Sequence, residues 1–134
     1  MAKITDIEGV GPAIAEKLSS VGITSVDGLL KACGSAKGRK EVAAKTGLDE
    51  KDLLEWTNHA DLFRIKGIGS EYADLLEAAG VDTCPELAKR KADNLTKKME
   101  EINAEKKLVR RTPPESVVED WINQAKKLPK IVTH

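Results

Sequence analysis

An internal repeat constrains the fold of this chain more than any other feature of its sequence. Residues 7–11 read Ile-Glu-Gly-Val-Gly, and residues 65–69, which lie 58 positions later, read Ile-Lys-Gly-Ile-Gly. The same offset relates glycine and apolar positions as far as residue 29: Ala15 and Ala73, Leu18 and Leu76, Gly22 and Gly80, Ile23 and Val81, and Leu29 and Leu87. Because these positions persist while the polar residues between them differ, the sequence predicts a duplicated structural unit.

The spacing of apolar residues is helical through most of the chain. They recur at intervals of three and four, and few stretches alternate as a β-strand would. In the first half this pattern predicts helices after Gly11 and after a cap at Thr24 or Ser25, one that ends near residue 47, and one over 50–63. In the second half it predicts helices over 70–79, after a capping Thr83, over about 92–109 and over 116–128.

The two tryptophans extend the repeat to its last helix. Trp121 lies 65 residues after Trp56, so about seven residues are inserted in the second copy, near 110–116, where Pro113 and Pro114 break a helix. Each copy then has about four helices, with a tryptophan on the last. We predict an all-α fold of two repeats, residues 1–62 and 63–134, packed into one compact unit.

Composition narrows the functional classes. Lysine plus arginine and aspartate plus glutamate number 22 each, which differs from the basic balance of a strongly electrostatic nucleic-acid binder. Aromatic residues make up 3% of the chain, too few for a base-stacking surface. No apolar run has the length of a membrane span and the N-terminus lacks a signal-peptide core, so we predict a cytoplasmic protein without a membrane partner.

Residues that could support catalysis or bind metal are sparse. No phosphate-binding loop that ends in Lys-Ser or Lys-Thr, nucleophile elbow or His-Glu-x-x-His motif is present, so we predict that the chain is not an enzyme. His59, Cys33 and Cys84 lack the spacing of metal ligands, so we predict no metal and no cofactor. The cysteines occupy unrelated places in the two copies, and we expect free thiols rather than a disulfide.

Several segments carry a resemblance to a known family. The opening Ile-Glu-Gly-Val-Gly-Pro, the Thr-Gly-Leu of residues 46–48 and the Trp-Thr-Asn-His-Ala-Asp-Leu of residues 56–62 resemble a bacterial domain family of unassigned function with tandem helix-hairpin-helix motifs. The turns at residues 7–11 and 65–69, here called the glycine turns, are also similar to hairpins of recombinase N-terminal domains and of repair nucleases and polymerases. That resemblance implies contact with the DNA backbone without base reading, and it allows a monovalent cation at the hairpin carbonyls.

The two glycine turns have a physical route to phosphate binding. Gly9 and Gly67 permit the positive φ that reverses the chain, and Gly11 and Gly69 leave the first helical amides open to a phosphate oxygen. Those amides carry the positive end of the helix dipole. With nearby side chains and four bases from a later segment, the candidate nucleic-acid-binding residues are Gly9, Gly11, Lys17, Lys66, Gly67, Gly69, Ser70, Lys97, Lys98, Arg110 and Arg111.

Other residues favour a purely structural turn. Nucleic-acid-binding hairpins commonly carry a lysine or arginine two positions after the second glycine, where this chain has Ala13 and Glu71. A carboxylate in the first turn of a helix compensates the dipole and repels a phosphate. Pro12 removes one amide donor and Glu8 lies inside the first turn. The alternative is therefore that the glycines only close a tight turn between helices.

Charge is unevenly distributed along the second half. Residues 89–111 contain nine bases and four acids, whereas residues 61–88 contain two bases and six acids. The basic segment can be an ordinary solvated surface, a stripe that binds a nucleic-acid backbone, or one partner in self-association with the acidic segment of another copy. We therefore predict a non-catalytic binding module with weak, sequence-independent contact to double-stranded nucleic acid. The alternative is a scaffold for protein interaction or self-assembly.

Overall fold

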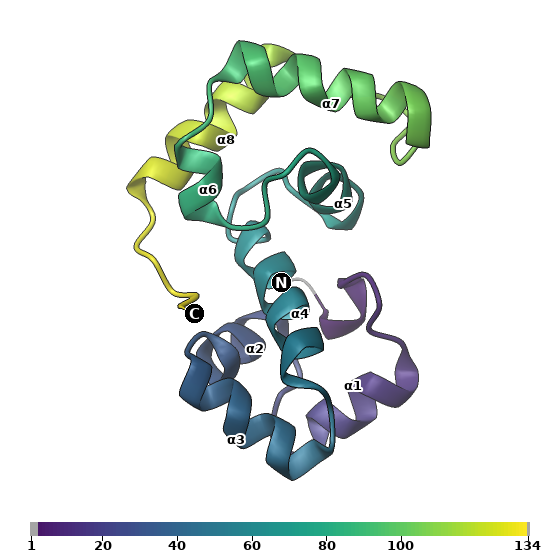
Figure 1. The fold of residues 1–134 in the computed structure, drawn as a ribbon, viewed down its shortest axis with the longest axis vertical. Coiled ribbons are helices and arrows are strands. Elements are labelled where there is room, and N and C mark those ends of the chain that lie inside the picture. The colour runs from purple at the N-terminus through teal and green to yellow at the C-terminus, as the bar shows by residue number, and fades with distance from the viewer. Residues whose placement is uncertain (1–2, 134) are drawn as a thin grey trace. The chain divides into compact units, whose positions relative to one another are not determined.

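The secondary structure of the chain is helical. The computed structural model describes residues 3–133 (Figure 1). Within them the elements are η1 (Ile4–Asp6), a 3₁₀ helix, and eight α-helices: α1 (Pro12–Ser19), α2 (Val26–Cys33), α3 (Ala36–Thr46), α4 (Glu50–Leu62), α5 (Ser70–Ala78), α6 (Cys84–Ala88), α7 (Ala92–Lys106) and α8 (Glu115–Lys127). These residues form no β-strand, only an isolated antiparallel bridge between Lys3 and Ser25. The predicted all-α fold class is confirmed.

Capping side chains explain where several helices begin. The Gly28 amide donates to Ser25 Oγ at 3.0 Å at the start of α2. Asp49 directly precedes α4, and its Oδ1 accepts a hydrogen bond at 2.8 Å from the amide of Lys51 in the first turn of that helix. Thr83 also precedes its helix, but its hydroxyl makes no capping bond, so the predicted side-chain cap of α6 is wrong. Pro85 occupies the second position of α6 and has no N–H to donate to that hydroxyl.

Helix α7 ends three residues earlier than the predicted limit near residue 109. Lys107 adopts a left-handed conformation with a φ of 51° and stops the helix. The side chain of Asn103 then holds the extended chain beyond it. Asn103 Nδ2 donates to the Val109 carbonyl at 3.0 Å, and the Val109 amide donates to Asn103 Oδ1 at 2.9 Å. This paired contact satisfies backbone groups that a longer helix would have used internally.

The chain divides into two compact units. Unit 1 comprises Met1–Asp61 and Lys130–His134, and unit 2 comprises Leu62–Pro129. The prediction of one compact unit is thereby replaced by two, because the apolar side chains of each stretch are buried mainly among residues of the same stretch. The last residues of the chain belong with unit 1, although the sequence placed them in the second repeat.

Within each unit the helices pack through apolar faces. In unit 1, α2 packs against α3 and η1 against α1. In unit 2, α8 packs against α6 and α7, and α5 packs against α7; Figure 1 shows α7 and α8 side by side. The largest fully buried side chains of unit 2 are Trp121, Leu62, Ile65, Leu75, Leu76, Leu87, Met99 and Val81. Those of unit 1 are Ile7, Leu18, Leu29 and Leu53.

No helix within residues 3–133 has both the length and the apolar character needed to cross a membrane.

Candidate functional site

The two turns that precede α1 and α5 have the same pattern of backbone hydrogen bonds. The Val10 amide donates to the Ile7 carbonyl at 3.1 Å, and the Ile68 amide donates to the Ile65 carbonyl at 3.2 Å. All four of these side chains are buried. The apolar residues therefore anchor each turn, while the residues between them, positions 8–9 and 66–67, are exposed.

A tryptophan lies against the glycine at the centre of each turn. Gly9 and Gly67 have φ values of 89° and 103°, as the sequence predicted. A Cβ at Gly9 would lie 3.1 Å from Trp56 Nε1, and one at Gly67 would lie 3.0 Å from Trp121 Nε1. The ring of Trp121 also packs against Tyr72 of α5, with centroids 5.2 Å apart. Both the backbone conformation and the close packing thus favour glycine at these two positions.

The second glycine of each turn leaves a helix N-terminus open. Gly11 and Gly69 are exposed N-cap residues with extended backbone, and neither α1 nor α5 has a capping side-chain bond from the part of the chain that the structure describes. A Cβ at either glycine would have no neighbour within 4 Å among those residues. The first residue of α1, Pro12, has no amide hydrogen. The first residue of α5, Ser70, has an N–H group, and the amides of a first helical turn have no partner within their own helix.

The charged side chains near the turns are less favourable than the glycines. Lys66 is exposed beside Gly67, as the sequence suggested. Lys17, however, lies in the last turn of α1, at the end opposite the open amides. Glu71 is exposed in the first turn of α5, where its carboxylate lies close to the open amides and partly compensates the dipole. The second turn therefore combines one cation with one anion.

Gln124 of α8 contributes to the second turn, and the sequence contained no sign of this role. The Lys66 amide donates to Gln124 Oε1 at 2.8 Å, and Gln124 Nε2 donates to the Lys66 carbonyl at 3.1 Å. Gln124 Nε2 also donates to Asp120 Oδ2 at 2.9 Å. The Gln124 side chain thus satisfies both backbone groups of Lys66, as a neighbouring β-strand would. It joins the second turn to α8, the helix that also carries Trp121.

The fold brings only some of the basic side chains of residues 89–111 into one pocket. Within this segment, Lys97, Lys98, Arg110 and Arg111 are all exposed. Lys98 lines a pocket of about 380 Å³ at the junction of α6 and α7, and the full lining is Lys89, Arg90, Lys91, Asn94, Leu95 and Lys98. Lys97, Arg110 and Arg111 are outside this lining, so the four bases predicted as one stripe do not all share the pocket.

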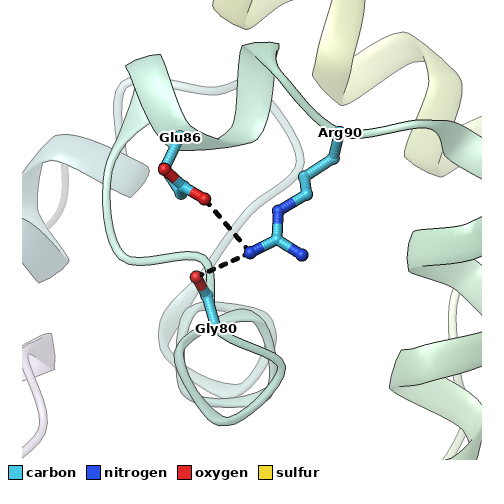
Figure 2. Close-up of polar contacts among 3 residues, drawn as sticks. All are labelled: Gly80, Glu86 and Arg90. Atoms are coloured by element: carbon cyan, nitrogen blue, oxygen red, sulfur yellow. Dashed lines mark hydrogen bonds and ion pairs between the residues drawn. The ribbon is translucent and has the colours of Figure 1, made fainter.

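Arg90 connects the pocket to the loop after α5. Its Nη2 donates to the Gly80 carbonyl and to Glu86 Oε1, both at 3.1 Å (Figure 2). Gly80 has a φ of 93°, and a Cβ there would lie 3.3 Å from Arg90 Nη2. The guanidinium thereby holds together the end of α5, the side of α6 and the connector that leads to α7. At the equivalent position of the first half the chain has Ala32, which cannot form this contact.

The remaining chemically versatile side chains are buried. Cys33 and Cys84 are free thiols, as predicted. Both have almost no exposure, and His59 is 4% exposed. Burial raises the pKa of Cys33 to about 11, although the nearby Arg39 charge and a hydrogen bond with Thr57 oppose that rise. A thiol of this kind is protonated at neutral pH and inert as a nucleophile. Residues 3–133 contain no group of three or more histidine, cysteine or acidic side chains that could hold a metal ion.

Comparison with known proteins identifies the family of the chain. Neither the curated proteins nor the solved structures contain a significant match. The family described as a domain of unknown function (DUF4332) matches residues 8–128. That span begins within the first glycine turn and ends just after α8, and it includes the second turn and the pocket. This protein therefore belongs to the DUF4332 family.

Proposed function

We propose that this protein is a non-catalytic module that binds the backbone of double-stranded nucleic acid weakly and without sequence preference. The proposal treats its two halves as helix-hairpin-helix repeats. The observation that carries it is the pair of open helix N-termini at Gly11 and Gly69. Among residues 3–133, no side chain caps them and no atom lies within 4 Å of a Cβ built on either glycine. Amides in that position donate to phosphate oxygens and act with the helix dipole.

The expected affinity is low. Pro12 and Glu71 weaken the two turns, and the net charge of the chain is zero. If about two to four phosphates are contacted, the slope of log K against log salt is about −2 to −4, and the dissociation constant is about 10⁻⁴ to 10⁻⁶ M. A cation at the turn is a lesser expectation, because the Lys66 carbonyl already accepts a hydrogen bond from Gln124.

A cap substitution separates the turns from general charge effects. Asp in place of Gly69 places a carboxylate on the open amides, which stabilises α5 and blocks a phosphate. The space above Gly69 accommodates the new side chain. We expect Gly69→Asp to weaken the binding of a labelled duplex in fluorescence anisotropy by about tenfold, equivalent to the roughly 1.4 kcal/mol of one charge-assisted contact. Lys127→Gln, in the exposed last turn of α8, also changes the net charge by −1 and is the control. Binding by Gly69→Asp equal to that of the unaltered protein contradicts the role of the turn.

The basic segment is tested separately. Replacing Lys97, Lys98, Arg110 and Arg111 by glutamine removes four exposed charges from α7 and the loop after it. We expect weaker duplex binding and a flatter dependence on salt, because fewer counterions are released. An unchanged salt slope excludes these four residues and leaves the turns as the contact.

A protein-interaction or self-assembly scaffold is the second candidate. Two observations favour it: Glu71 lies at the open end of α5, and tryptophan packing accounts for Gly9 and Gly67 without any ligand. The basic residues 89–111 and the acidic residues 61–88 would then meet between copies. Sedimentation at low and high salt tests this. Salt-sensitive dimers without duplex binding support the scaffold, and a monomer at every concentration contradicts self-assembly.

A further inference from the structure

The pocket at the junction of α6 and α7 concentrates positive charge in a concave site whose lining includes no residue of the glycine turns. Its lining contains four cationic side chains, one amide and one leucine, and no carboxylate: Lys89, Arg90, Lys91, Asn94, Leu95 and Lys98. The volume of about 380 Å³ lies in the lower range of small-molecule sites. Like charges held near one another in a concavity raise the local potential, and an anion relieves their repulsion.

Local structure explains why these residues converge. Lys91 is the N-cap of α7, and Asn94, Leu95 and Lys98 follow at three, four and seven positions, so they share one face of the helix. Lys89 and Arg90 reach the same face from the connector after α6. The bonds from Arg90 Nη2 to Gly80 and Glu86 fix that connector, and Figure 2 shows a second terminal guanidinium nitrogen that points away from both acceptors. The pocket is therefore built on an anchored loop.

The two nearby acids, Glu86 and Asp93, offset the four cationic side chains of this lining only in part. Glu86 forms an ion pair with Arg90 at 3.1 Å and leaves the three lysines uncompensated by that contact. Asp93 lies in the first turn of α7, and its Oδ1 accepts a hydrogen bond from the Asn94 amide at 2.8 Å. Because this carboxylate occupies one of the first helical amides, the positive character of the pocket comes from side chains and not from the helix terminus.

We propose that this pocket binds a phosphate group. Lysine ammonium groups and a guanidinium are the side chains that proteins use for phosphate oxygens, and an amide adds a neutral donor. The phosphate can belong to a small phosphorylated compound or to a nucleic acid. The pocket shares Lys98 with the basic segment of the proposed function. The inference nevertheless goes beyond that function, since it involves neither glycine turn and holds whether or not those turns bind DNA.

Calorimetric titration with inorganic pyrophosphate, at constant ionic strength, tests the pocket without nucleic acid. The test variant is Lys91→Gln with Lys98→Gln, and the matched control is Lys126→Gln with Lys127→Gln, which removes two exposed charges from the last turn of α8 in the same unit. We expect saturable binding that falls about five- to thirtyfold in the test variant and less than about twofold in the control. Circular dichroism verifies that both variants fold.

The two variants distinguish binding in the pocket from general attraction between the protein and an anion. No saturable pyrophosphate binding overturns the inference, and so does an equal loss in both variants, which indicates general charge attraction. Duplex titration of the same variants then identifies the source of the phosphate. Parallel loss of duplex and pyrophosphate binding in the test variant supports a nucleic-acid phosphate. Loss of pyrophosphate binding alone supports a small phosphorylated ligand, and either result is independent of the Gly69→Asp experiment on the turn.

Discussion

The glycines of the two turns serve different physical purposes at the residue scale. Gly9 and Gly67 have positive φ values and a tryptophan nitrogen where a Cβ would project, whereas Gly11 and Gly69 have extended backbone and open space. The conformation and packing of the first pair favour glycine, while the second pair leaves helix amides accessible. The same short motif therefore contains a structural position and a candidate binding position two residues apart.

Substituting Gly67 by alanine tests the structural position. We expect Gly67→Ala to lower the free energy of unfolding by about 2 to 4 kcal/mol, because strain at positive φ adds to the contact with Trp121. Gly22→Ala is the matched control, since its φ is 85° and no described neighbour lies within 4 Å of the new Cβ. It retains the strain alone, at about 1 kcal/mol. Equal losses in urea denaturation would exclude a contribution from the tryptophan.

The raised pKa of Cys33 predicts a loss of stability at alkaline pH. The ordinary pKa is 9.0 and the folded value is about 11, so the unfolded chain releases the thiol proton first. The contribution is fully present below pH 9 and declines as pH rises toward 11. Between pH 8 and pH 10 the free energy of unfolding should fall about 1 kcal/mol further in the unaltered protein than in Cys33→Ala. Denaturant titrations at both pH values measure this, and equal declines would contradict it.

At the element scale, the beginnings of α2 and α4 were more predictable than the end of α7. Ser25 and Asp49 cap the helices that follow, as their positions suggested, because a cap bond joins residues two or three apart. The end of α7 instead depends on Lys107 entering a left-handed conformation and on Asn103 bonding to Val109. Lysine is an unusual residue for such a position, so periodicity alone extended the helix too far.

A glycine at Lys107 should relieve the strain at the end of α7. Lys107 has a φ of 51° without the freedom of glycine, and the Lys107 amide donates to the Asn103 carbonyl at 2.9 Å. We expect Lys107→Gly to raise the free energy of unfolding by up to about 1 kcal/mol. Lys106→Gly, inside the last turn of α7, should lower it by a similar amount. Thermal unfolding measures both variants. A shift of the midpoint temperature in the same direction for both would show that the backbone conformation at position 107 does not cause the change in stability.

At the scale of the whole molecule, the chain returns to unit 1 after completing unit 2. Val132 is buried, and the Thr133 amide donates to the Gly34 carbonyl at 2.7 Å. Arg39, only 5% exposed, donates through Nη1 to the carbonyls of Cys33 and Gly34 and through Nη2 to that of Thr133. A buried guanidinium thus joins the end of α2 to the last residues of the chain.

Deleting residues 130–134 should destabilise unit 1 selectively. The deletion removes the buried Val132 side chain and three hydrogen bonds of Thr133, two of them made by its backbone, for a loss of about 2 to 4 kcal/mol. Amide hydrogen exchange should accelerate in residues 3–61 and change little in residues 62–129. Thr133→Ala retains the backbone bonds and should leave exchange nearly unaltered. Uniform acceleration across both units after the deletion would mean that the tail has no special role in unit 1.

The sequence by itself determined the helical class and the positive φ of Gly9 and Gly67 in the glycine turns. These features depend on local steric preference and on apolar periodicity, which act over a few residues. Only the tertiary structure decided that Gln124 holds Lys66, that Arg39 binds the tail, and that Lys98 joins a pocket without Lys97. Such contacts join residues remote in sequence or select one face of a helix, and no local pattern specifies which side chains the completed packing will bring together.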